Sequence, residues 1–143
     1  MVRVARADIP TIDAASAPYW EAAKQGELLI AECAACGKVH HYPRPFCPFC
    51  WSEDVHPVRA SGSGTLYTYS TVYVNDLAPF KERLPYVAAI VELAEGPRLM
   101  TTIEGADDDL RVGMPVTAVF RPVDDADPDS PYLTIFTPTE ESP

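Results

Sequence analysis

The hydrophobic pattern near the N-terminus of the chain has helical spacing. Residues 16–26 predict a short helix, because Tyr19 and Ala23 fall on one face of it. Pro18 suits the first turn of this helix, and Gly26 suits its end. A helix of this length is not stable alone in water, so we expect it to pack on the rest of the chain or on a partner.

The C-terminal part of the chain is rich in β-branched and aromatic residues, a composition that is typical of strands. Five strands are predicted, at residues 65–74, 86–93, 98–104, 115–123 and 132–137. The turn at 95–97 makes a hairpin of the second and third, and residues 107–112 predict a helical turn that ends at Gly113. The chain is therefore mostly β, and five antiparallel strands suggest a small closed barrel of OB type, with an open sandwich as the alternative.

Small residues at positions 60–64 predict a flexible linker between two domains. Residues 1–60 would hold an extended N-terminal arm, the helix and a cysteine-containing segment. Residues 61–143 would hold the barrel and end in a disordered acidic tail.

All four cysteines of the chain stand in two C-x-x-C pairs, Cys33 with Cys36 and Cys47 with Cys50. A strand at 28–32 leads into the first pair, and the spacing between the pairs allows a hairpin that brings all four sulfurs to one ion. This spacing predicts a rubredoxin-like ribbon with zinc, while two disulfides, unrelated thiols or an iron centre are the alternatives. Four cysteines fill the coordination shell, so the metal would be structural.

The residues around the cysteines raise two further points. Gly37 permits the left-handed turn that the first knuckle needs, whereas Trp51 occupies the equivalent place in the second knuckle, at a cost of about 1 kcal/mol if the backbone is left-handed there. Because four cysteines leave no ligand position open, His40, His41 and His56 are interpreted as ordinary surface or hairpin residues.

The charge of the chain argues against nucleic acid as a partner. Acidic residues number 21 and lysines plus arginines 11, which gives a formal net charge of −10. Such a field repels phosphate backbones, which normally require clustered lysine and arginine. The sequence also shows no apolar N-terminal run and no long apolar stretch, so we expect no signal peptide, no membrane span and a reducing, cytoplasmic location.

Positive charge is concentrated at two places in this acidic chain. Arg44 lies beside the predicted metal site, where it would either compensate thiolate charge or bind a ligand phosphate. The long loop at 75–85 brings Phe80, Lys81 and Arg83 together, as either a solvated loop or a ligand face, because loops at the barrel mouth usually bind the ligands of this architecture.

Residue patterns that would supply catalysis are missing from the sequence. It contains no Gly-x-Ser-x-Gly elbow and no phosphate-binding glycine loop, and the cysteines are assigned to metal. An accessory or binding role is favoured over a free-standing enzyme that would use an acidic residue at the barrel mouth.

Several segments, in one order along residues 16–137, resemble a zinc-ribbon and OB-fold family of acyl-CoA-associated accessory proteins, long known as a domain of unknown function beside thiolases. These segments are Tyr19–Glu21, Gly26–Leu29, the two cysteine pairs with Pro43–Pro45 between them, Gly62–Tyr69, Pro85–Ala88 and Val112–Val116. Trp51 departs from the family, which commonly has glycine at that position.

The resemblance implies a non-catalytic subunit that forms a hetero-oligomer with a thiolase-fold enzyme, such as a thiolase or a retro-aldolase of steroid side-chain breakdown. A hotdog-fold enoyl-CoA hydratase is the alternative partner. The helix and ribbon would hold the partner, and the barrel would help to enclose acyl-CoA, while the catalytic residues belong to the partner. By this analogy the candidates for contact with CoA are Arg44, Phe80, Lys81, Arg83 and Tyr86.

Overall fold

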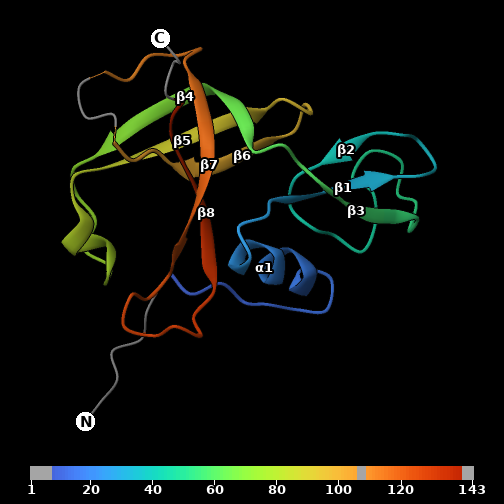
Figure 1. Ribbon diagram of the computed structural model, residues 1–143, viewed down its shortest axis with the longest axis horizontal. Coiled ribbons are helices and arrows are strands. Elements are labelled where there is room, and N and C mark those ends of the chain that lie inside the picture. The colour runs from blue at the N-terminus through green and yellow to red at the C-terminus, as the bar shows by residue number, and fades with distance from the viewer. Residues whose placement is uncertain (1–7, 106–108, 140–143) are drawn as a thin grey trace.

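The computed structural model describes residues 8–105 and 109–139. It consists of one helix, a three-stranded ribbon sheet and a five-stranded sheet that curls into a barrel (Figure 1). Helix α1 (Ala17–Lys24) contacts both the ribbon and the barrel, while the short 3-10 helix η1 (Phe80–Arg83) lies on the side of the barrel away from the ribbon. Neither of these helices is long enough to cross a lipid bilayer.

Helix α1 confirms the predicted helix. Pro18 stands in its first turn, and the chain leaves the helix through Gly26, whose φ of 79° is in the left-handed region. Ser16 occupies the N-cap position without capping the helix, and its backbone N–H instead donates to the Asp13 carboxylate at 2.8 Å. The buried face of α1 carries Tyr19 and Trp20, as its apolar spacing indicates.

The ribbon sheet has the order β2-β1-β3, with β1 (Leu29–Cys33) at its centre, and its strands are antiparallel. The outer strands are β2 (Val39–His40) and β3 (Val55–Arg59). Strand β3 was not predicted, because Pro57 interrupts its short apolar pattern. The structure tolerates this proline because β3 is an edge strand, where one row of N–H groups needs no partner.

The barrel has the strand order β6-β5-β4-β7-β8, and all four neighbouring pairs are antiparallel. Its strands are β4 (Ser63–Val72), β5 (Tyr86–Leu93), β6 (Arg98–Thr102), β7 (Pro115–Pro122) and β8 (Tyr132–Pro138). Between the two outer strands a single parallel bridge, Ile103 to Phe136, nearly closes the sheet. The predicted five-stranded OB-like barrel is therefore confirmed.

Two local expectations differ from the structure. The predicted helical turn at 107–112 is not helical over residues 109–111, and the chain turns at Val112–Gly113 instead; residues 107 and 108 lie outside the described part. The loop at 75–85 contains η1, which the sequence did not predict. Residues 1–7 of the expected N-terminal arm and residues 140–143 of the expected tail also lie outside the described residues.

The small residues at 60–64 make specific contacts. The N–H of Ala60 donates to the carbonyl of Leu28 at 2.8 Å, and the N–H of Ser61 donates to the Glu95 carboxylate at 2.8 Å. Ser63 and Gly64 are already part of β4. The division of the chain at residue 60 remains a prediction. These hydrogen bonds tie the segment to the residue before β1 and to the turn between β5 and β6.

Helix, ribbon and barrel share one hydrophobic core. Tyr19 and Trp20 come from α1, and Ile30 comes from the ribbon. The barrel contributes most of the remaining core residues, among them Leu66, Ala89, Val91, Leu93, Leu99, Val116 and Phe136. The ribbon therefore packs on the helix and the barrel through this common core.

Candidate functional site

The four cysteine sulfurs meet at one point at the end of the ribbon sheet. The Sγ atoms of Cys33 and Cys50 are 3.6 Å apart, those of Cys36 and Cys47 are 3.7 Å apart, and all four lie within 4.8 Å of one another. Tetrahedral zinc with zinc–sulfur bonds of about 2.3 Å separates its sulfurs by about 3.8 Å. The donor set therefore fits a zinc ion with a closed coordination shell.

Two equivalent turns position these sulfurs. In the first knuckle the N–H of Gly37 donates to the carbonyl of Cys33 at 2.8 Å, and in the second the N–H of Trp51 donates to the carbonyl of Cys47 at 2.9 Å. Both turn residues are left-handed, with φ of 75° for Gly37 and 68° for Trp51. The second knuckle therefore keeps the geometry that glycine favours, although a bulky residue occupies the position.

Trp51 packs on the surface of the ribbon despite its backbone conformation. Its ring stacks on Phe46, with centroids 5.2 Å apart and an interplanar angle of 11°, and 73% of Trp51 is exposed. An aromatic pair of this kind contributes about 1 kcal/mol, comparable to the strain of a left-handed non-glycine residue. The stacking thus offsets the strain.

Two substitutions separate these contributions, because Trp51→Ala and Trp51→Gly both remove the stacking and only the alanine keeps a Cβ. We expect the glycine protein to be more stable by about 1 kcal/mol, the reverse of the usual order of these residues. Urea unfolding of the two zinc-loaded proteins measures the difference. Equal stability, or a more stable alanine protein, would contradict the strain.

A groove of about 670 Å³ runs along the seam between the outer strands of the barrel. Besides the Ile103–Phe136 bridge, Thr101 Oγ1 donates to the carbonyl of Thr134 at 2.9 Å across this seam. The walls are mainly apolar and include Pro85, Val87, Ala88, Met100, Leu110, Leu133 and Ile135. The groove thus exists because β6 and β8 do not form a continuous ladder.

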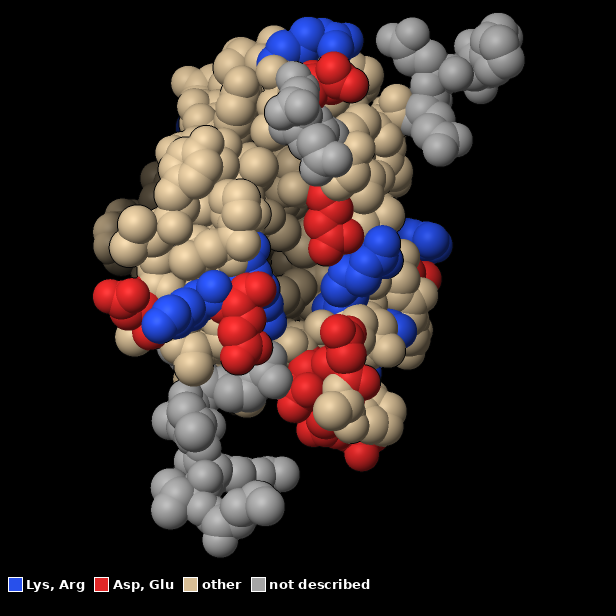
Figure 2. All heavy atoms as spheres, turned by 90° about the vertical axis from the view of Figure 1, so that its left-hand side faces the viewer, with Lys and Arg blue, Asp and Glu red and all other residues tan. Residues whose placement is uncertain are grey.

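The structure separates the residues proposed from the resemblance into two groups. Phe80, Arg83 and Tyr86 line the groove, whereas Lys81 does not. Arg44 lies in a different pocket, between α1 and the ribbon. Figure 2 shows the face that carries η1, with a hollow at its centre and basic and acidic side chains interspersed around it.

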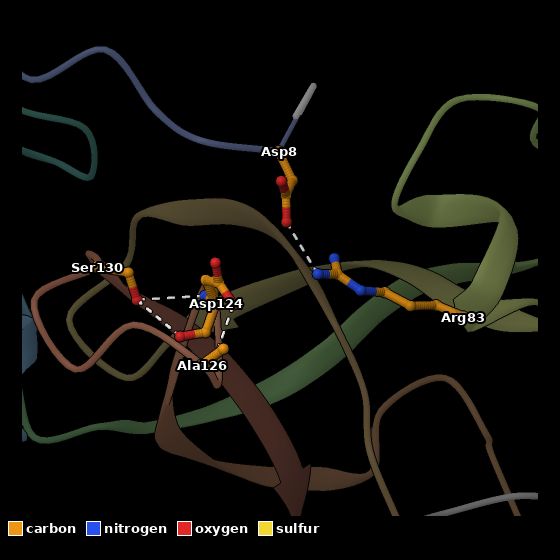
Figure 3. Close-up of polar contacts among 5 residues, drawn as sticks. All are labelled: Asp8, Arg83, Asp124, Ala126 and Ser130. Atoms are coloured by element: carbon orange, nitrogen blue, oxygen red, sulfur yellow. Dashed lines mark hydrogen bonds and ion pairs between the residues drawn. The ribbon is translucent and has the colours of Figure 1, made fainter. Parts of the chain in front are cut away.

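Arg83 is engaged within the chain. Its guanidinium donates to the Asp8 carboxylate at 2.8 Å, and the Asp8 side chain is only 3% exposed (Figure 3). The Arg83 guanidinium also lies 5.6 Å from the centre of the Phe80 ring. The N-terminal segment is thereby fixed beside the groove, a contact that sequence reasoning missed because Asp8 is far from Arg83 in the chain.

A second set of polar contacts drawn in Figure 3 lies within the loop between β7 and β8. The Asp124 carboxylate accepts from the N–H of Ala126 at 3.0 Å, and the Asp124 N–H donates to Ser130 Oγ at 3.2 Å. These contacts fix an acidic loop that the sequence predicted only as a connection.

Tyr19 links the segment that follows β2 to the groove. Its hydroxyl lies 3.2 Å from Nε2 of His41 and 3.3 Å from Oγ1 of Thr134, a groove-lining residue. Burial, together with a smaller contribution from the charge of His40, lowers the pKa of His41 to about 4. His41 is half-buried, and His40 is buried in strand β2 of the β1–β2 hairpin, so of the two interpretations His40 fits the hairpin residue and not the surface residue.

His41 makes the stability of the fold sensitive to acid. Its folded-state pKa lies below the unfolded value of 6.5, so below pH 6.5 the unfolded chain takes up a proton that the folded chain refuses. The stability that depends on neutral His41 is fully present above pH 6.5 and is lost as the pH falls toward 4. Relative to His41→Gln, we expect the wild type to lose about 1 kcal/mol of unfolding free energy between pH 7.5 and 5.5.

Urea unfolding at the two pH values measures this loss, and metal release by acid affects both proteins alike. His56→Gln is the matched control, because His56 is an exposed histidine of the same ribbon that pairs with Asp54. The control should keep the acid loss of the wild type. If His41→Gln shows the same loss as the wild type, His41 is not its source.

Comparison with known proteins agrees with this geometry. A family model for the rubredoxin-like zinc ribbon domain of ChsH2 matches residues 20–56, and a model for the C-terminal OB-fold domain of ChsH2 matches residues 57–121. The chain belongs to the ChsH2 family. The resemblance seen in the sequence is therefore confirmed.

Relatives of this ChsH2-family chain have several names. It is 41% identical over 136 residues to a "Probable enoyl-CoA hydratase alpha subunit" of Thermomonospora curvata, which covers 93% of this chain and 41% of that protein. It is 40% identical to a "DUF35 domain-containing scaffold protein" of Methanocaldococcus jannaschii, covering 71% and 74%. It is 30% identical to the "Benzoylsuccinyl-CoA thiolase subunit BbsA" of Geobacter metallireducens, covering 64% and 60%.

A solved structure described as "Ltp2-ChsH2(DUF35) aldolase" has the same fold as this ChsH2-family chain. The TM-score is 0.76 and the sequence identity 40%, and the similarity covers 90% of this chain and 98% of that one. The family is thus found in proteins named for hydratase, thiolase and aldolase assemblies, which supports an accessory, partner-bound role for its members.

Proposed function

We propose that this chain is a non-catalytic accessory subunit that binds a thiolase-fold enzyme, either a thiolase or a retro-aldolase, and helps to form its acyl-CoA channel. The observation that carries the proposal is the match to the ChsH2 chain of an aldolase assembly, at 40% identity over nearly the whole of that chain. The relative that is named as a thiolase subunit supports the same role with a thiolase as the partner.

The groove supplies the ligand part of the proposal. Its volume of about 670 Å³ is in the range of small-molecule sites, and such sites are mainly apolar with a few polar groups. The hydroxyl of Thr101 is already used in a hydrogen bond to the barrel, so the walls offer mainly apolar contact. Such walls suit the acyl and pantetheine part of the ligand, with Phe80 and Tyr86 at one end.

The metal has a structural part in the proposal. The four cysteines would hold zinc, which when bound fixes the two knuckles and with them the ribbon strands. No position in this shell is left for substrate, so chemistry on the acyl-CoA would belong to the partner.

Two experiments test this function. The partner enzyme purified without this chain should lose its acyl-CoA activity, and adding the chain should restore it. In the complex, Ala88→Phe places a ring in the groove and should lower kcat/KM for the acyl-CoA substrate about tenfold, an effect of 1.4 kcal/mol. Ala126→Phe, in the exposed loop between β7 and β8, is the matched control and should leave kcat/KM unchanged.

The proposal is contradicted if the partner enzyme has the same acyl-CoA activity with and without this chain. Thermal unfolding of both variants distinguishes a filled groove from a destabilised barrel. Turnover of acyl-CoA by the isolated chain would instead revive a free-standing enzyme.

A hydratase is the second candidate for the partner. The relative from Thermomonospora curvata is 41% identical over 93% of this chain and is named as a hydratase alpha subunit. This chain spans 41% of that protein. The hydratase partner of this chain would therefore be either a second polypeptide or a further domain. Co-purification with a thiolase-fold protein or with a hotdog-fold hydratase from the same organism decides between the two.

A further inference from the structure

The N-terminal segment at residues 8–13 meets the barrel groove at the end formed by η1. It contains neither a helix nor a strand, and residues 9 and 11–14 are exposed. Asp8 is the exception, because its side chain is only 3% exposed and accepts the hydrogen bond from Arg83 (Figure 3). A segment with few buried residues opens more easily than the paired strands of a barrel. The ion pair therefore joins an easily displaced part of the chain to the groove.

Arg83 itself is carried by a fixed end of the groove. Its guanidinium lies 5.6 Å from the centre of the Phe80 ring, and the centres of the Phe80 and Tyr86 rings are 6.2 Å apart. The Tyr86 hydroxyl accepts a hydrogen bond from Asn75 at 3.0 Å, which ties the start of the loop to the start of β5. These contacts hold the guanidinium at this end of the groove without any part of residues 8–13.

Arg83 supplies the positive charge of the groove. Among the described residues the lining contains two charged side chains, Arg83 and Glu104, and the rest of the wall is mainly apolar. Glu104 pairs at 3.6 Å with Arg121, which does not line the groove. Binding sites of this kind fix an apolar ligand through a small number of placed polar groups. The groove is therefore suited to an apolar chain that ends in an anionic group at Arg83.

The guanidinium of Arg83 has donors to spare for such a group. A guanidinium carries five N–H donors, and the contact with Asp8 is made by Nη2. The Arg83 side chain is 38% exposed. A phosphate binds a guanidinium best through two parallel hydrogen bonds. Because like charges repel at this distance, a phosphate and the Asp8 carboxylate compete for the same guanidinium.

We propose that Asp8 is an internal inhibitor of the groove, whose carboxylate occupies Arg83 in the free chain and is displaced by a phosphate of the CoA ligand. Displacement releases residues 8–13 from the end of the groove. An ion pair that leaves Arg83 free in roughly one molecule in ten lowers the affinity for the ligand about tenfold. The choice of CoA as the ligand rests on the proposed function, whereas the competition at Arg83 concerns this chain alone.

The test is a calorimetric titration of the zinc-loaded full chain with CoA. Asp8→Asn removes the competing charge and keeps the size of the side chain, so we expect it to bind CoA about tenfold more tightly than the wild type. In an Arg83→Gln background the same substitution should have no effect, because the two residues act through one contact. Glu82→Gln, which removes an exposed carboxylate of η1, is the matched control and should change the affinity less than about twofold at physiological ionic strength.

Pantetheine and inorganic phosphate divide the ligand into its parts. Pantetheine lacks the phosphates of CoA, so the wild type and Asp8→Asn should bind it equally. Inorganic phosphate should bind Asp8→Asn more tightly than the wild type. Weaker binding of inorganic phosphate than of CoA assigns the contact to CoA, and equal binding assigns it to phosphate in general; either result supports the competition.

The amide NMR signal of Ile9 reports the release of the segment. Ile9 follows Asp8 and is 52% exposed, so its signal depends on the anchor at Asp8. Both saturation with CoA and the Asp8→Asn substitution should move this signal toward its position in a disordered chain, while pantetheine should leave it in place. This readout separates displacement of Asp8 from a general gain of affinity through the loss of one negative charge.

Four results would each overturn the proposal. They are no binding of CoA to any of the proteins, equal CoA affinity of the wild type and Asp8→Asn, a gain that persists in the Arg83→Gln background, and an Ile9 signal that CoA does not move. The partner experiments decide a different question. A partner enzyme that works without this chain contradicts the proposed function and leaves the competition between Asp8 and phosphate in place.

Discussion

The Cys36→Ser protein is expected to lose bound zinc and, with it, the folded ribbon. Cys36 is one of the two exposed cysteines, so the substitution removes a ligand without leaving a cavity in the core. The ribbon strands are short, β2 having two residues and β1 and β3 five each, and such strands have little stability of their own. Structural zinc in small sites contributes on the order of 10 kcal/mol near neutral pH, more than the whole stability of many domains.

Two measurements check this result. Elemental analysis should give one zinc per wild-type chain and far less in Cys36→Ser, and amide NMR signals from Val39 and Val55 should collapse in the variant. Ala35→Ser is the matched control, because it places the same hydroxyl at an exposed position one residue away. The interpretation fails if Cys36→Ser keeps both its metal and a dispersed ribbon spectrum, or if Ala35→Ser loses them.

The meeting of the four cysteines was predictable from the sequence because its information is local. Each C-x-x-C pair needs only one turn, and both turns appear as the spacing indicates. The five barrel strands were predictable for a similar reason, since β-branched and aromatic runs between turn residues are visible without knowledge of the partners. The short strand β3 was missed because Pro57 interrupts the pattern that predicts a strand. Its strand conformation is evident only from its pairing with β1.

The candidate sites depend on contacts between distant segments, and there the sequence was less informative. The loop with Phe80 and Arg83 was predicted to carry ligand contacts, yet the groove beside it arises from the incomplete closure between β6 and β8. No sequence signal pairs Asp8 with Arg83. His40 was set aside because the metal had no open position, although what distinguishes it is burial without a partner, a property of the folded chain.

Gly64 is the clearest case of a residue whose role the structure changes. The sequence places it in a flexible segment, where Gly→Ala would stabilise the protein by about 0.5 kcal/mol through the unfolded state. In the structure it pairs with Leu93 of β5 and Val116 of β7, in a central strand of the barrel. A Cβ at this position would lie 2.7 Å from the carbonyl oxygen of Glu92 and 2.7 Å from Cγ1 of Val91.

We therefore expect Gly64→Ala to lower the unfolding free energy of the zinc-loaded chain by about 3 kcal/mol, the upper part of the range for overpacking. One of the two clashing atoms belongs to the backbone of β5, which is hydrogen-bonded on both sides and cannot move without disturbing its ladders. Ser63→Ala, at the exposed neighbouring residue of the same strand, should change the free energy by less than about 0.5 kcal/mol. Urea unfolding of the two proteins decides the matter: if Gly64→Ala is as stable as Ser63→Ala, Gly64 acts as a linker residue after all and the close packing of β4 on β5 does not hold the barrel together at this point.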